Sequence, residues 1–346
     1  MTASVTQSTS GAFKVKRPQR LLLVAGLIAT LAIPFLLGGR TTLAAATNIA
    51  VDGYAALLGL VLASWMARAL KLHLLLHRLK TPTTIARSFG ISLATDLAFA
   101  ATPAGIGGYV ATIYYLRRAG TSTTCAATIM AMDQGTDLVF FSISVPLVAL
   151  ALAGSDLSQT MTIAALGTAA VTLIFLATIW LARRKILSFV FAPNRLLERS
   201  SYLRRAQHAL RTFVTGSRTY VSLIIAAGPM FFLWMLGLTA VQWLTRYGVL
   251  WLTLLLLHHP VSFALTFLLQ VGVLHAALWT GIPAGGGGAE LGLTATLAPW
   301  VAPAQMATAL VIWRAATLYT SLLAGSVAMI ALARATPRVV AVHPPG

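Results

Sequence analysis

Long apolar runs separated by short basic segments constrain this chain more than any other feature of its sequence. Leu21 to Leu37 and Met161 to Leu181 are each about long enough to cross a bilayer core, which needs roughly 20 apolar residues per helix. Hydrophobic residues make up 58% of the 346 positions and charged residues only 9%. This composition excludes a water-soluble domain. It predicts an all-α polytopic protein of the cell membrane, with roughly seven or eight transmembrane helices.

Basic residues gather between the apolar runs. The formal net charge is +18, and Lys and Arg concentrate in Lys14 to Arg20, Arg68 to Arg87 and Arg183 to Arg218. Basic loops mark the cytoplasmic side of a membrane protein, so we expect these segments and both termini in the cytoplasm. Arg183 to Arg218 either lies on the anionic inner leaflet or is an ordinary loop. Nucleic acid is not an expected partner, because no basic segment joins a recognisable binding module.

The chain divides into two transmembrane halves, each interrupted by a Pro/Gly-rich break. The first break, Pro103 to Gly108, has a short apolar arm on each side and basic residues beyond both arms. This pattern favours a re-entrant hairpin that enters from the cytoplasm over two full crossings. The stretch from Tyr247 to Trp279 is either one crossing or two. The predicted organisation is a basic cytoplasmic tail (1–20), a first half (21–181), a basic cytoplasmic loop (182–218), a second half (219–333) and a cytoplasmic tail (334–346).

The two breaks are repeats of each other. A shift of 180 positions places Pro103-Ala-Gly-Ile-Gly-Gly108 on Pro283-Ala-Gly-Gly-Gly-Gly288, where five of six residues are identical. The helices that follow them run in opposite directions under the predicted topology, and inverted repeats with interrupted helices indicate a transport site. Backbone N–H groups at such breaks suit an anion such as phosphate. Alternatively, the breaks are only tight turns. The predicted lipid-binding residues are Pro103, Gly105, Gly107, Gly108, Pro283, Gly285, Gly286, Gly287 and Gly288.

Acidic residues inside apolar segments are the other candidates. The chain has only seven acids, and an acid inside the membrane costs several kcal/mol unless it is paired or hydrated. Asp133 and Asp137 share one helix face because they are four residues apart, and Asp96 and Glu290 also lie in apolar runs. We predict that Asp133, Asp137 and Glu290 contact a lipid head group.

Two pairings are open for these acids. Asp133 and Asp137 could instead pair with Arg117 or Arg118 and fix the hairpin in place. Arg314 lies in the last apolar run, where the repeat places Gln134 in the first half. It is therefore a candidate partner for an acid or a lipid phosphate.

No metal or cofactor site is predicted. Cys125 is the single cysteine, so neither an internal disulfide nor a cysteine metal cluster can form. His73 and His77 have helical spacing and His258 and His259 are adjacent, but neither pair has a third ligand nearby in the sequence. An enzymatic role is accordingly not expected.

The motifs around the second break resemble those of the lysylphosphatidylglycerol synthase transmembrane family, also called flippase-like integral membrane proteins. Pro283 to Glu290, followed by Trp313-Arg314, is similar to its second motif, and Pro103 to Gly108 to its first. The resemblance implies moving or binding an anionic lipid, such as a modified phospholipid or a polyprenyl-phosphate-linked sugar. Gly108 and Gln134 stand where the resemblance implies Glu and Arg, so we expect the first half to have lost a charge pair. The resemblance does not imply synthase activity, because nothing in this sequence after Pro337 could encode the soluble aminoacyl-transferase domain of full-length synthases.

Three functions remain open from the sequence. The first is a lipid translocase, for which membrane lipids and a second copy of the chain in a homodimer are the candidate partners. The second is a membrane-embedded lipid-phosphate transferase, although Mg²⁺ chemistry needs several clustered acids and Asp133 with Asp137 is a thin set. The third is a non-catalytic accessory subunit of a lipid-glycan pathway.

Overall fold

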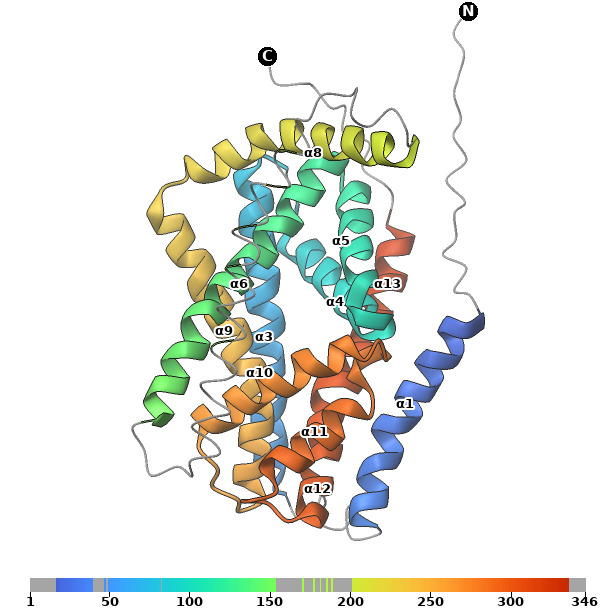
Figure 1. The fold of residues 1–346 in the computed structure, drawn as a ribbon, viewed down its shortest axis with the longest axis vertical. Helices are drawn as coiled ribbons and strands as arrows, with labels where there is room; N and C mark the ends of the chain where they lie inside the picture. Colours follow the sequence, from blue (N-terminus) through green and yellow to red (C-terminus); the bar gives the residue numbers. More distant parts are fainter. Residues whose placement is uncertain are drawn as a thin grey trace, which may run out of the picture.

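The computed structural model describes residues 17–39, 49–81, 83–153 and 201–335, together with the single residues 47, 170, 177, 181, 185 and 188. Within this part of the chain the elements are helices, and no strand occurs. The predicted crossing from Met161 to Leu181 and most of the basic loop before Ser201 lie outside the described residues. Figure 1 shows the helices packed as an elongated bundle, with α8 lying across one end.

The described part of the first half has long helices at both ends and shorter helices between them. Thr84 begins one short helix as its N-cap, since its side chain accepts a hydrogen bond from Arg87 N, which satisfies one free helix-end N–H. The elements are α1 (Arg17–Gly38), α3 (Val51–Arg78), α4 (Ile85–Ala101), the 3₁₀ turn η1 (Pro103–Gly105), α5 (Ile106–Arg118) and α6 (Thr123–Ala153).

The second half begins with long helices, and shorter helical elements follow them. Ser262 caps its short helix by accepting from Leu265 N, as Thr84 does in the first half. The elements are α8 (Ser201–Ile225), α9 (Pro229–Leu256), α10 (Phe263–Trp279), the 3₁₀ turn η3 (Pro283–Gly285), α11 (Gly288–Leu297), α12 (Pro303–Arg314), the π-helical segment η4 (Ala315–Tyr319) and α13 (Thr320–Arg334). The stretch from Tyr247 to Trp279 therefore holds parts of two helices, separated at His258, whose φ is 63°.

Corresponding helices of the two halves match in length. Helices α3 and α9 both have 28 residues, α4 and α10 both have 17, and each short helix leads into a three-residue Pro-Ala-Gly turn. Figure 1 shows the hairpins α4–η1–α5 and α10–η3–α11 approaching from opposite ends of the bundle, and the turns η1 and η3 contact each other where they meet. The two breaks of the sequence thus meet inside the molecule.

Three of the described helices are long and apolar enough to span a bilayer: α3, α6 and the continuous run from Pro303 to Arg334. A fourth span arises if α8 and α9 count as one, but these two helices meet at an angle of 95°. The bend lies at Gly228, whose φ of 80° suits glycine, followed by Pro229. The expectation of seven or eight crossings remains a prediction, since part of the chain lies outside the described residues.

One helix boundary differs from the sequence interpretation. Basic residues from Arg68 onward were assigned to a cytoplasmic segment, whereas α3 continues to Arg78. The apolar pattern persists through this stretch, because Leu72, Leu75 and Leu76 are buried. Arg68 and Lys71 therefore lie inside the bundle, where a charged side chain needs a partner.

Candidate functional site

The two helix breaks share an unusual backbone conformation. Ala104 has a φ of 51° and Ala284 a φ of 56°, so both lie in the left-handed region. A residue with a Cβ pays about 1–2 kcal/mol there relative to glycine. Such strained residues cluster at functional sites and persist only where the surrounding structure holds them. The breaks are therefore a defined local structure that occurs twice, and not merely two points where a helix stops.

At the second break, Glu290 and Arg314 form a buried ion pair. Arg314 Nε donates to Glu290 Oε1 at 2.6 Å, and Gly287 N donates to Glu290 Oε2 at 2.9 Å. The Glu290 side chain is fully buried and that of Arg314 is 6% exposed. Glu290 thus occupies the N-terminus of α11, where the sequence predicted a site for an external anion, and it also neutralises Arg314.

One donor group of Arg314 remains available. Its Nη1 donates to Ala284 O at 3.3 Å, inside the strained turn. Its Nη2 is buried and has no hydrogen-bond partner in the part of the chain that the structure describes. A buried guanidinium nitrogen without a partner is costly, and a ligand atom could supply the missing acceptor.

The first break lacks this ion pair. Gly107 N donates to Thr102 Oγ1 at 2.8 Å, so a hydroxyl takes the place that Glu290 has in the second half. A Cβ on Gly108 would lie 2.2 Å from the Phe99 ring, which leaves no space for the glutamate that the resemblance predicts here. Gln134, at the position equivalent to Arg314, accepts from Tyr109 Oη and donates to Asp133, both at 3.4 Å.

Lys71 lies at the centre of a cluster beside the first break. Its side chain is fully buried, and Nζ is 2.8 Å from Asp133 Oδ1 and 2.7 Å from Asp137 Oδ1. Nζ also donates to Thr239 Oγ1 on α9, at 3.3 Å. We call Lys71, Asp133 and Asp137 the lysine cluster. With all groups ionised its net charge is −1.

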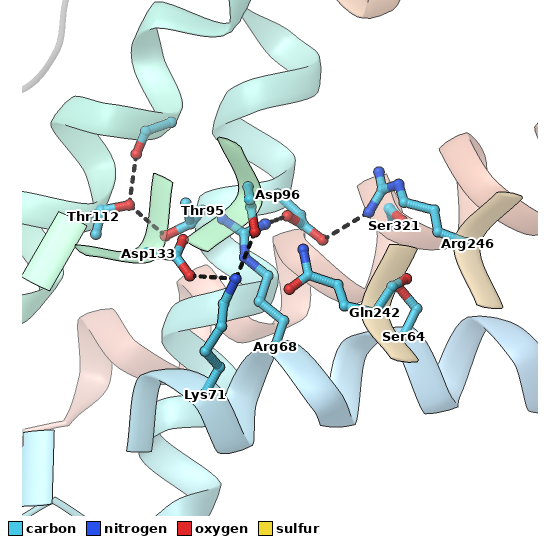
Figure 2. Close-up of polar contacts among 12 residues, drawn as sticks. Ser64, Arg68, Lys71, Thr95, Asp96, Thr112, Asp133, Gln242, Arg246 and Ser321 are labelled. Atoms are coloured by element: carbon cyan, nitrogen blue, oxygen red, sulfur yellow. Dashed lines mark hydrogen bonds and ion pairs between the residues drawn. The ribbon is translucent and has the colours of Figure 1, made fainter. Parts of the chain in front are cut away.

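A second cluster surrounds Asp96, which is 6% exposed. Asp96 forms an ion pair with Arg68, and Arg246 Nη1 lies 3.5 Å from Asp96 Oδ2 (Figure 2). Arg68 also places its guanidinium 5.5 Å from the centre of the Phe99 ring, a cation–π distance. We call Asp96, Arg68 and Arg246 the arginine cluster. Its net charge is +1, so the two clusters together are neutral.

The two arginines occupy corresponding positions in the halves. Arg68 is the 18th residue of α3, counted from Val51, and Arg246 is the 18th residue of α9, counted from Pro229. Both reach the same carboxylate, Asp96 of α4. The arginine cluster therefore joins equivalent points of the two halves to a single acid.

The structure assigns partners that differ from the sequence expectation. Asp133 and Asp137 pair with Lys71 and not with Arg117 or Arg118. Arg118 instead donates to the backbone oxygens of Ala333 and Ala335 at the end of α13. The prediction that Arg314 pairs with an acid is confirmed by its contact with Glu290. The first half, expected to have lost a charge pair, holds ion pairs at other positions.

Sequence reasoning missed Arg68, Lys71 and Arg246 as members of the site. The first two were counted with a basic loop, and Arg246 was not singled out within its long apolar run. One signal in the sequence could have identified these residues. Several acids in apolar segments need cations at a comparable depth in the membrane to neutralise their charge. Among the described residues, no group of three or more His, Cys, Asp or Glu side chains is placed to hold a metal ion.

The helical fold, its apolar spans and its buried ion pairs define a membrane protein with charged groups held inside the bundle. The model of the family described as the lysylphosphatidylglycerol synthase TM region matches residues 22–325, and the chain belongs to this family. This match confirms the resemblance that the motifs indicated. A search of curated proteins gave no significant match.

Proposed function

We propose that the protein is a lipid translocase of the cell membrane. Its substrate would be an anionic phospholipid or a polyprenyl-phosphate-linked lipid, which it binds or moves across the bilayer. The contact between the two strained breaks, with buried ion pairs beside each, carries this proposal. Buried charge is expensive within a membrane and is retained mainly along substrate pathways. Family membership is consistent with a lipid substrate.

In this proposal the two halves are inverted repeats, and both hairpins are re-entrant. The matched lengths of α3 and α9, and of α4 and α10, support equivalence of the halves. Hairpins that enter from opposite sides and meet would place their irregular backbone near the bilayer centre. There it must face protein or a wet cavity, as it does in transporters built on inverted repeats.

The lipid phosphate would use Arg314 at the second break. The unpartnered Nη2 of Arg314 offers a donor, and the anion would compete with Glu290 for the same guanidinium. The lysine cluster is partly accessible, with Asp133 18% and Asp137 14% exposed. Its surplus negative charge would attract a cationic part of the head group, a counter-ion or a proton.

A reconstitution experiment tests the translocase assignment. Glu290→Gln and Arg314→Gln should be combined, because removing one partner alone leaves a buried charge unpaired and costs about 3–5 kcal/mol. We expect the double variant to fold and to move fluorescent phosphatidylglycerol across liposome bilayers at least about tenfold more slowly, which corresponds to about 1.4 kcal/mol in the barrier. Asp52→Asn, which removes an exposed acid, is the matched control and should transport normally.

Two results would count against the translocase. Normal transport by the folded double variant would remove Glu290 and Arg314 from the site. Mg²⁺-dependent turnover of a lipid phosphate by the purified protein, without lipid movement, would favour the transferase alternative. An accessory subunit would show neither activity.

A further inference from the structure

We propose that the lysine cluster takes up one proton together with each anionic lipid, so that lipid movement is coupled to proton movement. This inference rests on the proposed function for the presence of an anionic lipid, and it adds a second ligand and an energy source. The proton forms an O–H bond with Asp137 Oδ2, while Lys71 stays an ammonium group and Asp133 stays a carboxylate. It comes from water on one side of the membrane and returns to water when Asp137 ionises again.

The charges of the site balance when no ligand is bound. Four acids face four cations across its ion pairs, and they are Asp96, Asp133, Asp137 and Glu290 against Arg68, Lys71, Arg246 and Arg314. A lipid phosphodiester that enters the site adds one negative charge, and uncompensated charge is strongly disfavoured inside a membrane. Uptake of one proton by one of the acids restores neutrality. The anionic lipid and the proton therefore bind together more favourably than either binds alone.

Two of the four acids are already well neutralised. Glu290 accepts from Arg314 Nε and from a backbone N–H, and Asp96 contacts two arginines. Protonation of either acid would leave an arginine without an anion inside the bundle. Asp133 and Asp137 instead share a single cation. The added proton therefore belongs in the lysine cluster.

Within the lysine cluster, Asp137 is the acceptor of the proton. Lys71 Nζ has three protons and three acceptors, which are the two carboxylates and Thr239 Oγ1, so it remains charged. Asp133 also accepts from Gln134 Nε2 at 3.4 Å. Asp137 contacts Lys71 through Oδ1, and its Oδ2 has no hydrogen-bond partner among the described residues. That oxygen is free to take the proton.

The other charged and titratable groups around Asp137 do not compete for this proton. From the neighbouring helices come Lys71 and Arg68 of α3, Tyr109 of α5, and Arg246 and Tyr247 of α9. The three cations already carry their protons, and a tyrosine is neutral at neutral pH. Helix α8 meets α6 where Tyr220 contacts Ser122, about four turns from Asp137. On α10, the exposed His275 contacts Phe141, one turn beyond Asp137, and it serves as a control below.

A row of buried hydroxyl groups gives protons a route to the site. Ser88, Ser92 and Thr95 share one face of α4, which begins beside the α8 end of the bundle. Ser88 Oγ and Ser92 Oγ are buried and have no hydrogen-bond partner in the described part of the chain. Buried hydroxyls without a protein partner are normally satisfied by ordered water. Figure 2 shows Thr95 and Asp96, at the inner end of this row, beside Lys71 of the lysine cluster.

Carbon-13 NMR of the aspartate carboxyl groups tests the proton site. The chain has five aspartates, so protein labelled at these carbons gives a small set of signals, each of which shifts when its group is protonated. On acidification in detergent, the first buried aspartate to titrate should be the one whose signal is missing from Asp137→Asn. This variant keeps the neutral pair of Lys71 with Asp133 and should fold. His275→Gln is the matched control and should leave the titration unchanged.

Addition of lipid to the same protein tests the coupling. Dihexanoylphosphatidylglycerol should move the titration of Asp137 to a less acidic pH by about one unit, which is a tenfold gain in proton affinity. Dihexanoylphosphatidylcholine, which has no net charge, should leave it in place. Because coupling between two ligands is reciprocal, the anionic lipid should bind more tightly at low pH to the natural protein, and with no such dependence to Asp137→Asn.

The outcomes separate this proposal from the translocase. An unchanged titration with phosphatidylglycerol, or a first buried signal that persists in Asp137→Asn, would overturn the coupled proton site. Lipid movement in liposomes together with an unchanged titration would overturn the coupling and leave the translocase standing. A shifted titration without lipid movement would do the opposite.

Discussion

At the scale of single residues, Lys71 is the cation on which the lysine cluster depends. Lys71→Met leaves Asp133 and Asp137 facing each other with no cation in contact, and removing one partner of a buried ion pair costs about 3–5 kcal/mol. Asp137→Asn instead leaves a neutral pair of Lys71 with Asp133. We therefore expect a large loss of thermal stability in detergent for Lys71→Met and a small change for Asp137→Asn.

The control for this prediction is a lysine of the same region. Lys80 is exposed just after α3, so Lys80→Met should leave the unfolding temperature nearly unchanged. If Lys71→Met unfolds no earlier than Lys80→Met, the ion pairs of the lysine cluster contribute little to the fold.

The site could be predicted in part at this scale. Glu290 and Arg314 were identified because their motif lies beside a visible Pro/Gly break. The shared partner of Asp133 and Asp137 was not identified. Lys71 lies about one transmembrane helical hairpin earlier in the sequence, where neighbouring basic residues suggest a loop. The sequence therefore identified the buried acids more readily than the cations that they contact.

At the scale of elements, Gly108 sets how closely α5 packs on α4. A Cβ at this position would lie 2.2 Å from the Phe99 ring, and overpacking of a buried site typically costs about 1–3 kcal/mol. Gly108→Ala should therefore lower the unfolding temperature and displace Phe99 from the guanidinium of Arg68. Phe99→Leu combined with Gly108→Ala should recover part of the stability, because it removes the clashing ring.

Gly135 provides the matched control within α6. A Cβ there would meet nothing within 4 Å, and alanine is favoured over glycine in a helix by about 1 kcal/mol. Gly135→Ala should keep or slightly raise the unfolding temperature. Equal behaviour of the two alanine variants would show that contact with Phe99 does not limit the approach of α5.

The breaks themselves were predictable at this scale, whereas one helix end was not. Proline and glycine change backbone preferences locally, so a helix interruption is visible in the sequence. The end of α3 was placed too early, because Lys71 and Arg78 suggest an aqueous loop. The buried Leu72, Leu75 and Leu76 show that packing continues through these charges.

At the scale of the whole molecule, both the membrane class and the family could be predicted from the sequence. The class follows because lipid requires long apolar runs, and the family follows from the motifs at the two breaks. The meeting of η1 and η3 does not follow from it, because that contact joins residues 180 positions apart. Neither does the position of α8 across one end of the bundle (Figure 1). Such contacts are set by the packing of whole helices, which no local pattern encodes.

Basic residues are distributed unequally between the two ends of the bundle. At the α8 end, Arg78 donates to Leu223 O of α8, and Arg87 donates to Arg118 O. The described turns at the opposite end, 257–262 and 298–302, contain no Lys or Arg. The positive-inside rule predicts that the α8 end faces the cytoplasm, where the exposed Arg205 and Arg211 would lie near anionic lipids.

This orientation is testable with two single cysteines in the Cys125→Ala background. His208 is exposed on α8, and Gln305 is exposed in the first turn of α12 at the other end of the bundle (Figure 1). A membrane-impermeant maleimide should label His208→Cys only in inverted vesicles and Gln305→Cys only in right-side-out vesicles. Labelling of both cysteines from one side would mean that the bundle does not span the membrane between these ends, and the reverse pattern would place the basic end outside. The same experiment therefore decides from which side of the membrane the hairpin α4–η1–α5 enters. In the proposed translocation path this hairpin enters from the cytoplasm, so the first break opens toward that side.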